Sequence, residues 1–208
     1  MTADPRMAGL APAIAAGLQA GARALRDGQH AQAEQHFIKA MQQAPAHPEP
    51  LRYLAILQLH TRRAPLAVQT LQRALALAAD DALLHSDLGN AQSSIGALDA
   101  AFASWRRACA LDPAQPMPWF NLGRNLQQRG DTDAAIDALT QAATLAPDLV
   151  PARILLGDAL VHAGRFDEAV ARYREVLAQH PSCGDAWRGL SNIKTRTLAD
   201  ADADALRS

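Results

Sequence analysis

One pattern returns at a fixed interval through most of this chain of 208 residues. The string GDTDAAIDALTQAATLAP ends at Pro147, and related strings end at Pro181 and Pro113, at the same distance after it and before it. The period is 34 residues (147 − 113 and 181 − 147). A fixed period of this length predicts stacked copies of one helical unit, because each copy buries its apolar face against the next. The copies span residues 14–47, 48–81, 82–115, 116–149 and 150–183, without an insertion or deletion.

Small residues recur at fixed places in these copies, which predicts pairs of closely packed helices. Glycine ends the first helix of four copies, where a left-handed residue suits it, and Arg62 takes that place in the second copy. The small residues at the helix contacts are Ala33, Ala67, Ala101, Ala135 and Ala169 on the second helices, and Gly21, Ala55, Gly89, Gly123, Gly157 and Ser191 on the first. Bulky partners fill the space between the helices, at Phe37, Leu71, Trp105, Leu139 and Tyr173.

Composition excludes several functions. Only 4% of residues are aromatic, and 20 basic residues face 21 acidic ones, so the basic excess of a nucleic-acid-binding surface is absent. Cys109 and Cys183 have no metal-ligand spacing and are interpreted as free thiols of a reducing compartment, which predicts a cytoplasmic protein without a metal or other cofactor. No apolar run reaches the length of about 18 residues that a membrane helix needs. No catalytic motif is found, so we expect no enzymatic activity from the chain itself.

The fourth copy resembles the tetratricopeptide repeat (TPR) at nearly every diagnostic position: Trp119, Leu122, Gly123, Leu126, Ala135, Leu139, Ala142 and Pro147. The resemblance implies an all-α fold, a right-handed α-solenoid of five TPR helix pairs. We expect residues 1–13 to form a lead-in, 184–196 a capping helix, and 197–208 the start of a linker or helix that is cut off at the end of the chain.

TPR arrays line a concave groove with their first helices, so the resemblance implies a protein-binding scaffold that holds a peptide or a partner domain. Amides in this groove suit the backbone of an extended peptide, and Arg124 suits a carboxylate or phosphate. The candidate groove residues are Arg52, Tyr53, Ser86, Asp87, Asn90, Met117, Phe120, Asn121, Arg124, Gln128, Asp158, His162 and Arg188.

Asn90 and Asn121 occupy the positions of two asparagines in TPR domains that bind chaperone tails. The cations of that carboxylate clamp are missing here, because Ser86, Pro151 and Leu155 stand in their places. A chaperone-tail receptor is therefore rejected. The asparagine pair also resembles the amide ladder of TPR arrays that grip peptide backbones, and the alternative is that both are ordinary solvated positions.

Two further interpretations stay open, the first of which comes from the tail. Trp187, Leu190, Ile193, Lys194 and Thr195, followed by Asp200 and Asp202, resemble the junction at which bacterial TPR arrays precede a sulfotransferase domain. On this resemblance the chain is the acceptor-recruiting arm of an enzyme whose 3′-phosphoadenosine-5′-phosphosulfate-binding domain lies further along, and contacts that domain within the same polypeptide. The other interpretation is an assembly factor that forms homo-oligomers through its convex face or its cap.

Overall fold

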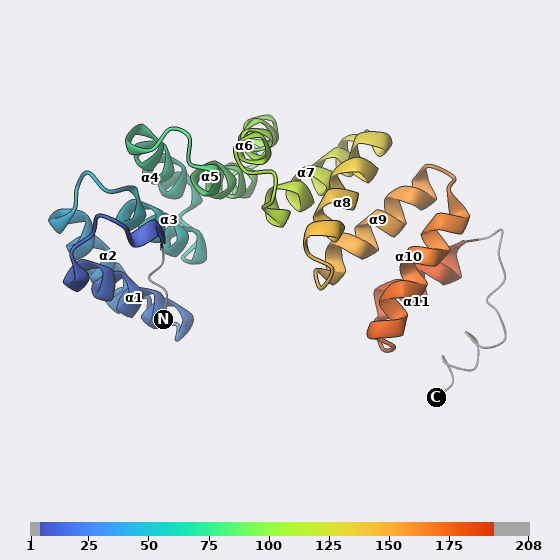
Figure 1. Ribbon diagram of the computed structural model, residues 1–208, viewed down its shortest axis with the longest axis horizontal. Helices are drawn as coiled ribbons and strands as arrows, with labels where there is room; N and C mark the ends of the chain where they lie inside the picture. Colours follow the sequence, from blue (N-terminus) through green and yellow to red (C-terminus); the bar gives the residue numbers. More distant parts are fainter. Residues whose placement is uncertain (1–4, 194–208) are drawn as a thin grey trace. The chain divides into compact units, whose positions relative to one another are not determined.

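The computed structural model describes residues 5–193, which contain helices and no strand (Figure 1). The chain divides into two compact units, Met1–Asp112 (unit 1) and Pro113–Ser208 (unit 2). Because each unit has its own core, the two are described separately.

Unit 1 begins with a short 3₁₀ helix and continues with three antiparallel helix pairs. Each helix contacts the next along the chain, and the first helices of neighbouring pairs, α1, α3 and α5, also contact one another. The elements are η1 (Pro5–Met7), α1 (Pro12–Arg26), α2 (His30–Gln43), α3 (Pro48–His60), α4 (Ala64–Leu77), α5 (Ala82–Ser94) and α6 (Leu98–Leu111).

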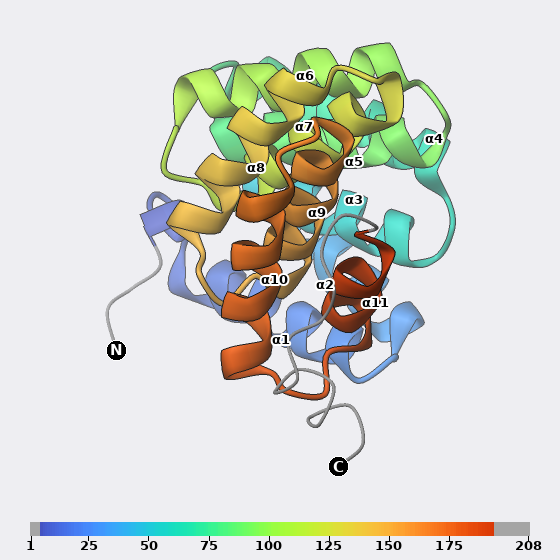
Figure 2. The same ribbon diagram turned by 90° about the vertical axis from the view of Figure 1, so that its right-hand side faces the viewer.

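Unit 2 contains two helix pairs and a final helix, with the same neighbour relations. Figure 2 shows α11 lying beside α10, and α11 also contacts α9. The elements are α7 (Pro116–Arg129), α8 (Thr132–Leu145), α9 (Val150–His162), α10 (Phe166–Gln179) and α11 (Gly184–Asn192). The predicted capping helix 184–196 is thus described as far as Asn192, and residues 194–208, with the predicted linker helix, lie outside the described part of the chain.

The small and bulky residues that recur at fixed places in the repeats form the contacts between helices. The five alanines of the second helices are fully buried, and the bulky partners from Phe37 to Tyr173 are at most 1% exposed. A Cβ atom added at Gly89 would lie 2.5 Å from the Trp105 ring, and one at Gly157 would lie 2.5 Å from the Tyr173 ring. The glycines therefore leave the space into which the large side chain of the second helix fits.

Ser191 was wrongly predicted to take the place of these glycines on the last helix. Its hydroxyl donates to the Trp187 carbonyl oxygen, and the side chain is exposed. Gly189, on the same helix, instead lies against the Tyr173 ring. No second helix follows α11 within the described residues, so α11 meets the preceding pair through a different part of its surface.

The turns between the helices of a pair confirm the predicted left-handed residues. Gly28, Gly96, Gly130 and Gly164 have φ values between 74° and 79°. Arg62 adopts φ 59° at the same place in the second pair. A side chain in this region is strained, so the second pair keeps the common turn despite its sequence.

Each unit buries its own apolar core. In unit 2 the largest cluster runs from Ile136 to Ile193 around Tyr173, and in unit 1 two clusters surround Phe37 and Leu71. No helix within residues 5–193 is long and apolar enough to cross a bilayer.

Candidate functional site

The first helices of each unit form a continuous row, and the predicted groove residues lie along it. We call this surface the first-helix face. In unit 1 it contains Arg52, Tyr53, Ser86, Asp87 and Asn90 on α3 and α5. In unit 2 it contains Met117, Phe120, Asn121, Arg124, Gln128, Asp158, His162 and Arg188 on α7, α9 and α11.

Charged residues on the first-helix face of unit 1 are bonded to one another. Glu49, only 1% exposed, accepts a hydrogen bond of 2.7 Å from Arg6 Nε. Arg6 also donates to both carboxylate oxygens of Asp81, at 3.2 and 2.7 Å. Asp81 in turn caps α5, because its Oδ1 accepts from the backbone N–H groups of Leu83 and Leu84. A segment that precedes the first repeat is thereby tied to the second repeat and, through the cap of α5, to the third.

Arg52 extends this cluster. Its Nε donates to Glu49 at 3.1 and 3.2 Å, and its Nη1 donates to Asp87 at 3.3 Å. The guanidinium also lies 5.0 Å from the centre of the Tyr53 ring, which stacks on Phe37. The predicted groove residues Arg52, Tyr53 and Asp87 are therefore engaged in contacts within the protein.

The pKa values of the two aspartates of this cluster are shifted in opposite directions. Burial raises the pKa of Asp87 above its ordinary value, and the nearby Arg52 only partly offsets this. Burial also acts to raise the pKa of Asp81, but the hydrogen bonds from Arg6 and from the Leu84 and Leu83 amides outweigh it and lower that pKa. Asp81 is thus held as a carboxylate, whereas Asp87 is less readily ionised.

Two predicted groove residues serve the packing of helix pairs instead. Asn90 Oδ1 accepts a hydrogen bond of 3.1 Å from the Trp105 indole N–H, and Asp158 Oδ1 accepts one of 2.6 Å from the Tyr173 hydroxyl. Burial and then the Asp158 carboxylate raise the pKa of Tyr173, so the phenol stays protonated as the donor. Both acceptors follow directly after the glycine beneath the ring.

This coupling could have been found in the sequence. In the repeats whose bulky residue carries an N–H or O–H, the residue after the close-contact glycine is Asn90 or Asp158. Where the bulky residue is Phe37 or a leucine, the residue after the small residue (Gly21, Ala55 or Gly123) is Ala22, Ile56 or Arg124. The polar ring therefore has a fixed acceptor, as buried donors require.

Ser86, another predicted groove residue of unit 1, is also buried.

Arg6 and Asp81 were missed by sequence reasoning. Arg6 lies in the lead-in, before the repeats, and carries no signal of its own. Asp81 directly precedes a helix, which is a typical N-cap pattern, but the pattern does not show that a distant arginine binds it.

The first-helix face of unit 2 differs. The Arg124 guanidinium lies 5.7 Å from the centre of the Phe120 ring and, within residues 5–193, makes no ion pair. Met117 is 45% exposed on the same helix, and Gln128 and His162 lie nearer the ends of α7 and α9. Arg188 pairs with Asp185 at 2.7 Å on the exposed surface of α11. Asn121 is buried, and Asn90 lies in the other unit, so their predicted joint action stays a prediction.

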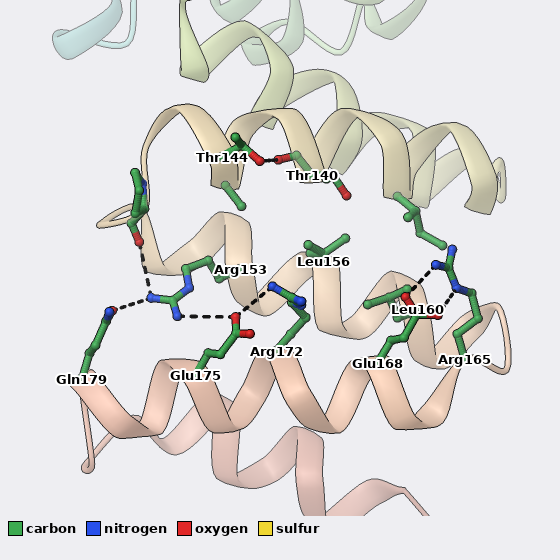
Figure 3. A pocket seen from close by; sticks show the side chains of 13 residues that line it. Thr140, Thr144, Arg153, Leu156, Leu160, Arg165, Glu168, Arg172, Glu175 and Gln179 are labelled. Atoms are coloured by element: carbon green, nitrogen blue, oxygen red, sulfur yellow. Dashed lines mark hydrogen bonds and ion pairs between the residues drawn. The ribbon is translucent and has the colours of Figure 1, made fainter.

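A cavity of about 460 Å³ lies on the opposite side of α9, between α8 and α10 (Figure 3). Leu156 and Leu160 of α9 form its floor, and Thr140 and Thr144 of α8 form one wall. This side of α9 is turned about half a revolution from Asp158 and His162, as the helical spacing requires. The cavity is therefore not part of the predicted groove.

Charged groups along the other wall of this cavity are paired. Arg165 bonds Glu168 at 2.7 Å, and Arg172 bonds Glu175 at 2.9 Å, both close to or on α10. Arg153, 8% exposed, donates to Gln179 at 2.6 Å and to the Pro147 carbonyl at 3.4 Å (Figure 3). The Arg153–Gln179 bond joins α9 to α10, and the pairs along α10 leave little unused charge for a ligand.

The described residues 5–193 contain no cluster of metal ligands. No group of three or more His, Cys, Asp or Glu side chains there is placed to hold a metal ion. Burial raises the pKa of the Cys109 thiol to about 12, which makes it a poor nucleophile. Cys183 and His180 flank the turn between α10 and α11.

Family models agree with the repeat and the fold. A model described as tetratricopeptide repeat matches residues 24–91 and again 126–193, and a second of the same description matches residues 80–150. The chain belongs to the tetratricopeptide repeat family.

Curated relatives share the repeats. The chain is 31% identical over 117 residues to small glutamine-rich tetratricopeptide repeat-containing protein 2 of Mycosarcoma maydis, which covers 56% of this chain and 33% of that protein. It is 34% identical over 95 residues to cellulose synthase operon protein C of Pseudomonas fluorescens, covering 46% and 7%. The chain thus spans no more than about a third of the length of these relatives.

Solved TPR structures have the same fold. TTC0263, a thermophilic TPR protein of Thermus thermophilus, is 23% identical, with a TM-score of 0.66 over 94% of this chain and all of that one. YrrB, a TPR protein with an unusual peptide-binding site, is 22% identical, with a TM-score of 0.71 over 81% and 89%. At this identity the likeness shows the fold alone.

The sulfotransferase resemblance of the tail remains a prediction. Leu190 and Ile193 are buried against the core of unit 2, and Trp187 donates its indole N–H to the Pro181 carbonyl at 2.8 Å. The other residues of that pattern, Lys194, Thr195, Asp200 and Asp202, lie outside the described residues.

Proposed function

We propose that this chain is a non-catalytic protein-interaction scaffold that binds a peptide on the first-helix face of unit 2. The observation that carries the proposal is Arg124, a guanidinium stacked on Phe120 without an ion-pair partner in the described residues. The cluster around Glu49 and the wall of the α8–α10 cavity pair their charges internally. Arg124 retains its capacity to bind a carboxylate.

The chemistry of this face defines the class of ligand. The five N–H groups of a guanidinium bind a carboxylate in two parallel hydrogen bonds. Met117 offers an exposed apolar and adaptable surface on the same helix, and Gln128 adds an amide. The ligand is therefore a peptide with an acidic side chain or a terminal carboxylate next to an apolar residue. TPR relatives with peptide-binding sites support a protein-interaction role.

Peptides selected on the folded chain from a random displayed library test this proposal. Their dissociation constants would be measured by fluorescence anisotropy for the chain and for Arg124→Ala. We expect a loss of about tenfold or more, because a charge-assisted hydrogen bond contributes about 1.5–3 kcal/mol.

Two control variants identify the surface that binds. Arg106→Ala removes a similar arginine, 5.8 Å from the centre of the Phe102 ring, from the second helix α6, and should leave affinity unchanged. Thr140→Arg fills the α8–α10 cavity and should also have no effect. Peptides that lose affinity through Thr140→Arg but not through Arg124→Ala would move the site to the other side of α9 and refute the proposal.

A further inference from the structure

The segment Pro5–Leu10, which we call the N-terminal strap, lies against the first-helix face of unit 1. The Arg6 guanidinium contacts Glu49 and Asp81, the Met7 side chain is buried, and the Ala8 carbonyl oxygen lies 3.1 Å from His47 Nε2. The polar partners are between 39 and 75 residues away in sequence. The strap is thus attached through a few side chains and not through a helix–helix interface.

The carboxylates beneath the strap depend on Arg6. Glu49, Asp81 and Asp87 place three carboxylates in this cluster, whereas Arg52 is the guanidinium that α3 itself supplies. Arg6 bonds Glu49 and, through both of its terminal nitrogens, Asp81. When Arg6 leaves, Glu49 and Asp81 lose a planar donor whose geometry matches two carboxylates. The vacated surface has the shape and charge that favour another arginine.

The strap is built to detach as a unit. Its own backbone hydrogen bonds are local, from Ala8 N–H to the Pro5 carbonyl and from Leu10 N–H to the Met7 carbonyl, both 3.1 Å. Gly9 has φ 87°, and Ala11, just before α1, is extended. A cavity of about 350 Å³ lined by Pro5, Ala8 and Pro48 lies beside Arg6. Rotation about Gly9 can therefore lift Arg6 and Met7 away while the Ala11 carbonyl oxygen still accepts from Ile14 and Ala15 at the start of α1.

We propose that the N-terminal strap is an autoinhibitory contact, in which Arg6 occupies the place that an arginine of a partner peptide takes when the strap opens. In the closed form the first-helix face of unit 1 is blocked at the start of α3 and α5. In the open form Glu49 and Asp81 bind the incoming guanidinium, and the surface under Met7 accepts the apolar residue that follows it. The ligand class is an extended peptide with an arginine followed by an apolar side chain.

A synthetic peptide with the sequence of residues 2–11, labelled with a fluorophore at its carboxyl end, serves as the probe. It should bind the Arg6→Ala chain at least tenfold more tightly than the unaltered chain. The attached strap competes at an effective concentration of about a millimolar, and Arg6→Ala removes this competitor. The same peptide with alanine for Arg6 should bind neither chain, and Glu49→Gln in the Arg6→Ala chain should abolish binding. Equal affinity for both chains, binding to neither chain, or binding that does not need the arginine of the peptide would overturn the proposal.

A second measurement uses the unaltered chain and needs no variant to fold. Amide hydrogen exchange of Ala8 and Leu10 should be at least a hundredfold faster than that of the buried α3 amides, because the strap opens while the helices stay folded. Exchange of both sets at one common rate would show that the strap opens only with global unfolding, which would refute the proposal. Arg124→Ala should not alter probe binding, so this proposal and the one for unit 2 fail independently.

Discussion

The first-helix faces of the two units have the same arrangement of helices, but their arginines differ in whether they are paired within the protein. In unit 1, Arg52 lies over Tyr53 and is bonded to Glu49 and Asp87, and Arg6 covers the cluster. In unit 2, Arg124 lies over Phe120 without such partners in the described residues. A few side chains on a common frame therefore decide whether a face is closed by the protein or offered to a ligand.

The difference also concerns what stabilises each unit. Unit 1 combines apolar packing with a half-buried ion-pair cluster that joins the strap to α3 and α5. The ion pairs of unit 2 between Arg165 and Glu168 and between Arg188 and Asp185 lie on the exposed surface. Such pairs contribute little to stability, so unit 2 depends mainly on the core around Tyr173.

The largest expected effect follows from Glu49→Ala in unit 1. It leaves Arg6 and Arg52 without their shared, almost fully buried carboxylate, and breaking a buried pair costs about 3 kcal/mol. Urea unfolding would be followed by circular dichroism, which reports on the helices of both units. The matched variant in unit 2, Glu168→Ala, removes an exposed partner of Arg165 and should leave stability unchanged. Equal losses from both would contradict the contrast between the units.

Gly157→Ala tests the packing on which unit 2 depends. The new Cβ would lie 2.5 Å from the Tyr173 ring, which is held between α9 and α11, so we expect a loss of about 2 kcal/mol from overpacking. Thermal unfolding monitored by circular dichroism measures it. In unit 1, Ala55 takes the same place opposite Leu71, and Ala55→Gly should cost about 1 kcal/mol through helix propensity, with a further loss because its methyl group is buried. A stable Gly157→Ala chain would show that the ring is free to move.

The charge cluster should make unit 1 sensitive to pH in two directions. The lowered pKa of Asp81 contributes stability above its ordinary value of about 3.9, and this is lost as the pH falls through the folded-state pKa. The raised pKa of Asp87 has the opposite effect on stability. Its stabilising contribution is present at low pH and is lost as the pH rises through the folded-state pKa.

Urea unfolding from pH 7 to pH 3 compares the two aspartates. Asp81→Asn keeps a helix-capping side chain but loses the charge for Arg6, which should cost about 1 kcal/mol at pH 7. This deficit should shrink as the pH falls, whereas the advantage of the unaltered chain over Asp87→Asn should grow. Parallel curves for both variants would disprove the opposite shifts.

The smallest expected effect concerns the turn at Arg62 in unit 1. Arg62→Gly relieves a side chain at φ 59° and should stabilise the chain by about 0.5 kcal/mol, since the greater freedom of glycine in the unfolded chain offsets part of the gain. Gly164→Ala at the equivalent turn of unit 2, where φ is 74°, should instead cost about 1 kcal/mol. Chemical denaturation of both variants, compared as midpoints, gives the sign.

Much of the fold could be predicted from the sequence because its signals are local or strictly periodic. The positions of Ala135 and Gly123, the left-handed turn at Gly164 and the ends of the helices before proline all follow from the regular spacing of the repeats. The misplacement of Ser191 has a physical reason, because the periodic rule assumes a following second helix.

The candidate site was predicted less completely. The first-helix residues were found as a set, but their individual roles were not. Asn90 and Asp158 were expected to face a ligand, yet each accepts a hydrogen bond from a buried ring of its own helix pair. Their spacing from Trp105 and Tyr173 contains this information, whereas no spacing relates Arg52 to Asp87 or Arg6 to Glu49.

The sequence by itself determined the repeat, the helix pairs and the row of first helices, because a fixed period repeats the same local contacts in every copy. Only the tertiary structure decided which charges along that row are already used. Arg6 meets Glu49 and Asp81, 43 and 75 residues away, and such pairing depends on how side chains from separate elements converge in space. Arg124 has no such partner within residues 5–193, and that difference distinguishes the two faces.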